Sequence, residues 1–318
     1  MVRLTREPAL RMLLIFRTHL SLCLAVGLAC SPALGQAQQE PSSAIDQAFR
    51  YLYNFEFQDA HRVLDRFERE YPDNPMGGAT RSAVYLFTEL HRLDLLASEF
   101  FQDRGDRIQK KKLDPDPVLR DKLFETTAQT RESGRKILAS DPKNVEALFA
   151  LSTAAGIESD YLFFVEKKRL GSLKLHKESH NYCRQLLEID PDYPDAYLTS
   201  GFYEYLVGDL PFFLRWFIRF DGVEGDKEKG IERLQYVSKN ARYSAGFAKV
   251  LLAAVYLREE RPADSVDMLA ELSREYPSNP LFPREALRIC EENDLPVPAV
   301  VAAWKTGGES TGAHSSQP

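Results

Sequence analysis

The sequence lacks the short motifs that mark the common classes of enzyme. It contains no glycine-rich phosphate loop, no G-x-S-x-G nucleophile elbow and no C-x-x-C pair. These absences weigh against nucleotide-dependent enzymes, serine hydrolases and thiol-redox proteins. We therefore expect a protein that is not an enzyme and that has no catalytic residues, no cofactor and no metal site.

Cysteine is scarce, and its spacing does not suggest a disulfide framework. The chain has four cysteines, of which Cys23 and Cys30 lie near the N-terminus. The other two, Cys183 and Cys290, are far apart in a long chain, unlike the dense cysteines of small disulfide-bonded domains. We expect both to be small buried core residues.

Acidic residues are nearly absent from the first 37 positions, where Glu7 is accompanied by four arginines. The apolar run Leu20–Ala29 is too short to span a bilayer, and small residues follow it. This pattern predicts a signal peptide over residues 1–37, cleaved after Gly35 or Ala37. It places the protein in the periplasm, outside the cell or at the envelope.

The chain also has no excess of positive charge. Its formal net charge is −6, and removal of residues 1–37, with four arginines and one glutamate, gives −6 − 3 = −9. A negative protein is a poor general binder of nucleic acid, so we expect none as partner.

What the sequence does have is a repeated helix stop. At each stop, Asp or Tyr is followed by proline, which the interior of a helix does not tolerate. An Asp, Asn or Ser that can cap the next helix comes shortly after the proline. The four stops are Tyr71-Pro72, Asp141-Pro142, Asp190-Pro191 and Tyr276-Pro277. After the third stop, we expect Asp195 to cap the following helix.

Around this third stop, the order of residues resembles the tetratricopeptide repeat (TPR). One helix ends at Asp190-Pro191, and the next carries large and small residues at helical spacing, such as Tyr197, Gly201 and Tyr205. The TPR period is about 34 residues. The resemblance covers residues 42–74, 145–191, 194–242 and 246–279.

This resemblance implies an all-α, right-handed superhelical solenoid of antiparallel helix pairs over residues 38–292. It also implies a protein or peptide partner. The Pro-, Gly- and Ser-rich stretch 293–318 is expected to be a disordered tail. A narrower resemblance, over residues 201–257, is to the tetratricopeptide-repeat-39-type proteins, some of which are linked to mitochondrial membranes.

The intervals between stops are longer than one period, which indicates inserts between paired helices. Pro142 and Pro191 are 191 − 142 = 49 residues apart, with the surplus at Asp160–Lys174. A second insert lies between Gly208-Asp209 and Gly225-Asp226. A third, Ser98–Lys112, is alternatively the remains of another repeat. Each insert has a Phe pair followed by basic residues: Phe100-Phe101, Phe163-Phe164 and Phe212-Phe213.

The insert at 210–220, LPFFLRWFIRF, has two interpretations. As a short helix it gathers aromatic rings beside arginines, which suits a membrane interface. Alternatively it is buried and plugs the superhelix, as large aromatics mostly do in soluble proteins. We expect the plug. The residues concerned are Phe212, Phe213, Arg215, Trp216, Phe217, Arg219 and Phe220.

The first helix of each TPR pair lines the concave groove, and here its positions are apolar, aromatic or acidic. They lack the Lys, Asn and Arg typical of TPRs that clamp a C-terminal carboxylate. An apolar groove suits a partner helix or extended segment, unless the inserts fold back and fill it. Both alternatives stay open. The predicted groove residues are Glu146, Phe149, Asp195, Leu198, Phe202, Tyr205, Phe247 and Val250.

One pair of residues invites a catalytic interpretation. His176 and His180 are four apart on one helix face and could hold zinc. Zincins, however, have Glu directly after the first His, whereas Glu178 comes one residue late. We expect both histidines to be exposed polar helix residues.

The sequence thus predicts an exported, non-catalytic TPR scaffold for protein–protein interaction at the envelope. One alternative is a peripheral membrane adaptor that uses the aromatic and basic inserts. A remote alternative is a metal-dependent hydrolase.

Overall fold

Helix is the regular structure throughout the part of the chain that the computed structural model describes, residues 41–96, 113–209 and 225–312. The helices are α2 (Pro41–Tyr53), α3 (Phe57–Glu70), α4 (Pro75–Arg92), α6 (Pro117–Ser140), α7 (Val145–Asp160), α8 (Arg169–Ile189), α9 (Tyr197–Asp209), α11 (Lys227–Asn240), α12 (Ala245–Arg258), α13 (Pro262–Glu275), α14 (Leu281–Glu292) and α15 (Ala299–Gly312). A π-helical turn, η1 (Tyr161–Val165), and a 3-10 turn, η2 (Pro194–Ala196), join them.

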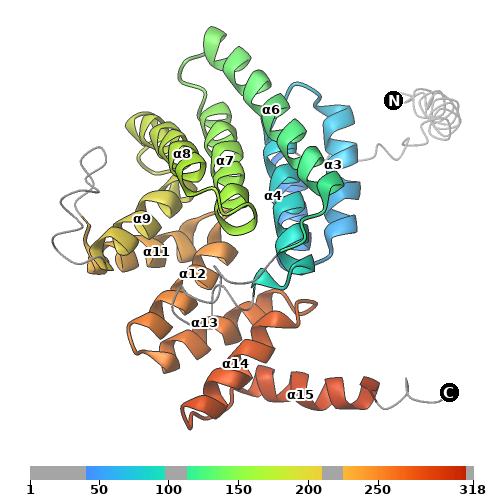
Figure 1. The fold of residues 1–318 in the computed structure, drawn as a ribbon, viewed down its shortest axis with the longest axis vertical. Helices are drawn as coiled ribbons and strands as arrows, with labels where there is room; N and C mark the ends of the chain where they lie inside the picture. Colours follow the sequence, from blue (N-terminus) through green and yellow to red (C-terminus); the bar gives the residue numbers. More distant parts are fainter. Residues whose placement is uncertain (1–40, 97–112, 210–224, 313–318) are drawn as a thin grey trace, which may run out of the picture. The chain divides into compact units, whose positions relative to one another are not determined.

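Helices that follow one another pack together in pairs along the described chain (Figure 1). The pairs are α2 with α3, α4 with α6, α7 with α8, α9 with α11, and α12 with α13, and α14 then packs on α13. This order confirms the predicted all-α, TPR-like array. The packing of α4 on α6 shows that the long unit between Pro75 and Pro142 contains a helix pair, while residues 98–112 lie outside the described range.

The helix stops lie where the proline pattern predicts them. At the residue before each proline, a backbone N–H donates to the carbonyl four positions back, as Asp141 does to Ile137 and Tyr276 does to Leu272. Asn74 and Asn144 then cap α4 and α7 through their side chains. Local chemistry therefore sets the ends of most helices.

Asp195 is different, and the prediction that it caps the helix after Pro191 is wrong. Its carboxylate accepts backbone N–H bonds from Arg242, Tyr243 and Ser244, at 2.9, 2.9 and 2.7 Å. These are the residues before α12, in the next helix pair. Because three amides converge there, Asp195 joins two neighbouring pairs rather than starting its own helix.

The first helix pair packs against turns near the other end of the array. The Tyr53 hydroxyl donates to the Tyr243 carbonyl at 2.9 Å, 190 positions away, and Asn279 Nδ2 donates to the Tyr53 carbonyl at 2.7 Å. The Phe49 and Tyr243 rings stack, with centroids 5.4 Å apart. Helix α2 therefore covers inner surface that an open solenoid would leave accessible.

The surplus of residues between Pro142 and Pro191 is helical rather than an inserted loop. The π-helical turn continues α7 up to Val165, and α8 is 21 residues long. Between them Lys167 adopts a left-handed backbone conformation, with φ of 58°. The predicted insert at Asp160–Lys174 thus lengthens both helices of its pair.

The same segment, Val145–Val165, is long and apolar enough to cross a membrane, with 21 residues and a mean hydropathy of 1.3. In the most apolar 18-residue window of this segment 56% of the residues are buried, and α7 packs on α4, α6 and α8. It is a core helix of the described array.

The two ends of the next insert lie side by side. A Cβ atom built on Gly225 would lie 2.6 Å from the Gly208 backbone nitrogen, a separation that only glycine permits. The predicted interface residues Phe212, Phe213, Arg215, Trp216, Phe217, Arg219 and Phe220 lie outside the described residues. The plug and membrane interpretations stay predictions, as does the signal peptide, which is also outside the described range.

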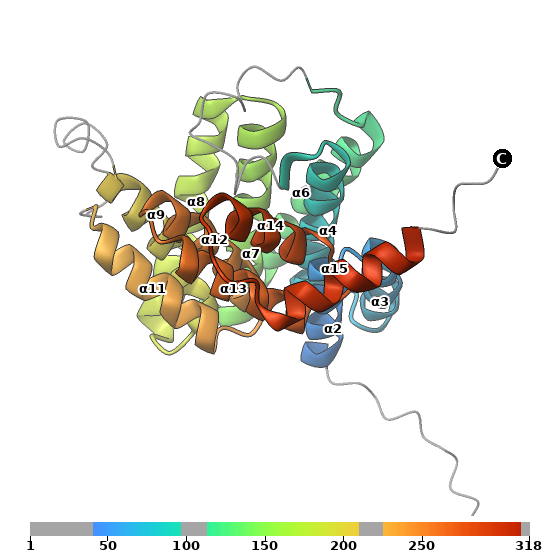
Figure 2. The ribbon, with the colours of Figure 1, turned by 90° about the horizontal axis from the view of Figure 1, so that it is seen from below.

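The predicted disorder after residue 293 does not hold for α15, which follows α14 (Figure 2). Val301 is fully buried in the cluster formed by α13 and α14. The apolar run AVVAA gives this helix one buried side, and burial of that side offsets the cost of ordering it. The two remaining cysteines, Cys183 and Cys290, are free and buried, as predicted.

Candidate functional site

The inner face of the helix pairs borders a partly open cavity of about 150 Å³. Its lining comes from α2, α4, α7, α8, α9 and α12, so that pairs far apart in the sequence contribute to one space. The wall is mostly apolar and includes the rings of Phe49, Phe87, Phe149 and Phe247. Phe87 and Phe247 meet edge to face, with centroids 5.7 Å apart.

Small residues on α7 keep this space open. Ser152, Thr153 and Gly156 face the cavity, and a Cβ atom on Gly156 would meet only Ser179 Oγ, at 3.4 Å. Ser152 Oγ donates to the Ser179 carbonyl at 3.1 Å and lies 2.9 Å from Cys183 Sγ. Hydrogen bonds between α7 and α8 therefore satisfy the hydroxyl of Ser152.

Two carboxylates line the cavity, and one of them is fully engaged. Asp195 Oδ1 accepts bonds from Tyr243 N–H, Ser244 N–H and the Ser244 hydroxyl, while Oδ2 accepts from Arg242 N–H. Backbone amides are fixed donors, so this carboxylate has a structural role.

The second carboxylate, Asp160, ends α7 and has no hydrogen-bond or ion-pair partner among the described residues. Asp160 is half-buried, and it forms part of the cavity wall. Burial alone raises the pKa of Asp160 to about 7. The group is therefore near the midpoint of its titration at neutral pH.

The structure brings some predicted groove residues together and separates others. Phe149, Asp195, Leu198 and Phe247 line the cavity together. Tyr205 is completely buried, and its hydroxyl donates to Glu259 at 2.9 Å.

The remaining predicted groove residues lie outside the cavity wall. Phe202 is half-buried in the cluster between α9 and α12, Val250 is buried, and Glu146 is exposed. The partner-binding groove itself stays a prediction.

Sequence reasoning missed the contribution of α2 and α4 and the position of Asp160. The first could not be found from local patterns, because the contacts of α2 are with turns about two hundred positions later. A signal for Asp160 does exist: it ends the apolar helix α7 and directly precedes Tyr-Leu-Phe-Phe-Val. An acid within an apolar run is expensive to bury and is worth testing as a site.

His176 and His180 are not exposed, contrary to expectation. Both are half-buried on α8 and contact the Tyr203 ring of α9 in a tilted arrangement, at centroid distances of 5.5 and 6.5 Å. Burial, with a smaller contribution from His180, lowers the pKa of His176. No group of three His, Cys, Asp or Glu side chains that could hold a metal ion occurs among the described residues.

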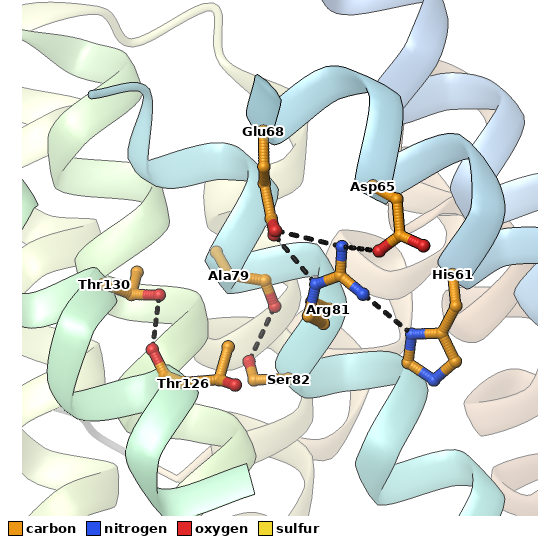
Figure 3. A network of polar contacts seen from close by, with 8 residues as sticks. All are labelled: His61, Asp65, Glu68, Ala79, Arg81, Ser82, Thr126 and Thr130. Carbon is orange, nitrogen blue, oxygen red and sulfur yellow. Dashed lines mark hydrogen bonds and ion pairs between the residues drawn. The ribbon is translucent and has the colours of Figure 1, made fainter. Parts of the chain in front are cut away.

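A polar cluster on α3 and α4 has a structural explanation (Figure 3). Arg81 donates to both oxygens of Glu68 at 2.8 and 2.9 Å, to Asp65 at 2.9 Å, and lies 3.2 Å from His61 Nδ1. Burial and the Arg81 charge lower the pKa of His61 to about 4. With its guanidinium shared among these partners, Arg81 ties the two helices together.

An outer surface at the junction of α7 and α8 is apolar and basic. Leu170 is 87% exposed, and Phe163 and Leu173 are 43% and 40% exposed. Arg169 and Lys174 are exposed beside them. Exposed apolar side chains close together in the sequence are candidates for a contact surface.

The chain is similar in structure to two solved proteins. One is TTC0263, a thermophilic TPR protein of Thermus thermophilus, with 12% identity, coverage of 78% of this chain and 98% of that chain, and a TM-score of 0.42. The other is yeast Tom70, with 12% identity, coverage of 81% and 67%, and a TM-score of 0.31. No protein family and no curated protein matches the sequence. The description of the chain as a TPR-like helical array therefore rests on the packing of its helix pairs.

Proposed function

We propose that this protein is a non-catalytic scaffold that binds another protein or peptide through the inner side of α9 and α12, and that it acts at the cell envelope after export. The observation that carries the proposal is a group of neighbouring apolar side chains that are only half-buried. Leu198, Phe202 and Phe247 pack on the α9–α12 cluster and keep accessible surface. Partly accessible apolar side chains of this kind can anchor a partner segment.

The test compares two aromatic residues that differ in burial. Phe202→Ala removes a half-buried ring, and Tyr236→Ala removes a ring on α11 that is 40% exposed and packs edge to face on Tyr197. A photo-reactive amino acid at position 202 identifies the partner by cross-linking. Capture of that partner should fall about tenfold or more in Phe202→Ala.

Tyr236→Ala is the matched control, and its capture of the same partner should be unchanged. Melting temperatures of both variants show whether either change acts through stability. Equal capture by wild type and Phe202→Ala would refute this interface.

Export is tested separately. N-terminal sequencing of the exported protein should find a start near Gln36 or Gln38. A mature protein that still carries residues 1–30 would contradict the signal peptide and the envelope location.

A second candidate function, peripheral membrane attachment, is favoured by the outer surface of Leu170, Phe163 and Leu173. Apolar side chains inserted between lipid headgroups, with Arg169 and Lys174 near anionic lipid, would hold the protein on a bilayer surface. Flotation with anionic vesicles tests this function. Leu170→Glu should abolish co-flotation, whereas Val297→Glu, at a residue 40% exposed elsewhere, should not. Failure of the wild-type protein to float would remove this candidate.

A further inference from the structure

The inner cavity combines an apolar wall with one carboxyl group that nothing in the described part of the chain satisfies. Asp195, in the same wall, is held by four hydrogen bonds, whereas Asp160 has no described partner. The residues described around the cavity include no Lys, Arg or His. A positive charge for Asp160 must therefore come from outside these residues.

We propose that the cavity is a binding site for a small apolar amine, whose ammonium group pairs with the Asp160 carboxylate. This ligand site goes beyond the proposed scaffold function. The two sites share Leu198 and Phe247, but Asp160 lines only the cavity and Phe202 belongs only to the scaffold interface.

The size of the cavity limits the ligand. At about 150 Å³ it has the volume of apolar cavities that accept a benzene-sized molecule. The helical residue Gly156 contributes to this space, since a side chain there would meet only Ser179 Oγ at 3.4 Å. The part of the ligand that enters the cavity is therefore a single ring or a short branched chain with one charged arm.

The chemistry of the wall selects the charge of the ligand. A cation neutralises the Asp160 carboxylate and replaces the water that burial removes from it. The faces of Phe87, Phe149 and Phe247 also attract an ammonium group through their ring electrons. An anion would be repelled by Asp160, and a purely apolar ligand would leave the carboxyl unsatisfied.

Benzylamine and toluene are suitable probes, because they share a ring and differ in the amine. Titration calorimetry at pH 8, where most of Asp160 is ionised, should show benzylamine binding to the wild-type protein about tenfold or more tightly than toluene. Asp160→Asn keeps the shape of the side chain and removes its charge. In this variant the affinities for the two ligands should become equal within about twofold.

A second variant tests the location. Gly156→Leu fills the cavity and should abolish binding of both ligands, with folding checked by circular dichroism. If that variant does not fold, the comparison of the two ligands in the wild-type protein and in Asp160→Asn still decides the matter.

Three results would overturn the proposal: no benzylamine binding by the wild type, equal binding of toluene and benzylamine, or an unchanged amine preference in Asp160→Asn. The partner-capture assay distinguishes this failure from failure of the scaffold function. Asp160→Asn should capture the protein partner as the wild type does, and Phe202→Ala should still bind benzylamine.

Discussion

The cavity wall contains two aspartates, Asp195 and Asp160, whose carboxylates differ in the hydrogen bonds that they accept. Between α9 and α12, the Asp195 carboxylate accepts hydrogen bonds from three backbone N–H groups and one hydroxyl group. At the end of α7, Asp160 borders the cavity without a described partner. The first carboxylate holds two helix pairs together, while the second lacks such donors, so that a ligand cation or a proton would lower the cost of its charge.

This difference shows that burial alone does not define the role of an acidic residue. What matters is the supply of donors around it. The turn before α12 presents three amides that no helix in the described chain uses, and Asp195 satisfies them. The region around Asp160 presents rings and small residues, so that its charge stays uncompensated.

The largest loss of stability is expected on substitution of Asp195. Asp195→Ala leaves the amides of Arg242, Tyr243 and Ser244 without an acceptor and should lower the free energy of unfolding by about 3–5 kcal/mol. Urea denaturation measures this loss. A loss below about 1 kcal/mol would mean that water can replace the carboxylate. It would contradict the assignment of a structural role to Asp195 and not to Asp160.

The next largest loss of stability is expected where α2 contacts the turn before α14. Asn279 is 1% exposed, donates to the Tyr53 carbonyl and accepts from Leu281 N–H. Asn279→Ala should therefore cost about 2–3 kcal/mol, because two buried backbone groups lose their partners. Asn240→Ala, which removes only an exposed bond to Tyr236, is the control and should cost less than about 1 kcal/mol. Equal losses would argue against a tight contact between α2 and the turn before α14.

At Asp160 the expected change in stability has the opposite sign, because loss of the carboxylate should stabilise the protein. The pKa of Asp160 is about 7 in the folded protein, above the ordinary value of 3.8, so the folded state binds more protons than the unfolded state between about pH 4 and 7. This contribution to stability therefore falls as pH rises through that window. A shift of this size corresponds to at most about 4 kcal/mol, and the solvent contact of the half-buried side chain reduces this value. Asp160→Asn lacks the effect and should be more stable than the wild type by on the order of 2 kcal/mol at pH 8.

The control for this prediction is pH itself. Near pH 4 the folded state keeps its proton and ionisation of the unfolded state has only begun to favour unfolding, so that most of the gain should vanish. Urea denaturation of both proteins at pH 4 and pH 8 measures the difference. A gain that is the same at both pH values would show that ionisation of Asp160 is not its cause.

The smallest expected changes in stability concern two glycines, Gly156 and Gly230. Gly156→Ala should stabilise the protein by about 0.5–1 kcal/mol, because alanine is the better helix former and its Cβ atom has room beside the cavity. Gly230→Ala should destabilise, since its Cβ atom would lie 2.5 Å from the Tyr205 backbone nitrogen. Melting temperatures that move in the same direction for both variants would contradict the assigned free space at α7.

The helix pairs could be predicted from the sequence because their signals are local. Proline stops a helix wherever it stands, and Asn74 and Asn144 cap helices only two or three residues away. The position of Asp195 could not be predicted in this way, because its donors lie 47 to 49 positions later.

The cavity could not be predicted from these signals at all. It exists because α2, α4, α7 and α12 converge, and no spacing within one repeat encodes that convergence. The groove residues chosen by repeat position were therefore a mixture: Phe149 and Phe247 reach the cavity, while Tyr205 lies in the core between α9 and α12.

The central claim is that Asp160 is half-buried beside an apolar cavity without a described partner for its charge. The carboxyl carbon of Asp160, observed by NMR and assigned with the Asp160→Asn variant, tests this claim most directly. Its chemical shift should titrate with a pKa of about 7. Benzylamine should move that midpoint to lower pH, because the ammonium group favours the ionised carboxylate. A midpoint near pH 4 without any ligand, as for an exposed aspartate, would contradict the account.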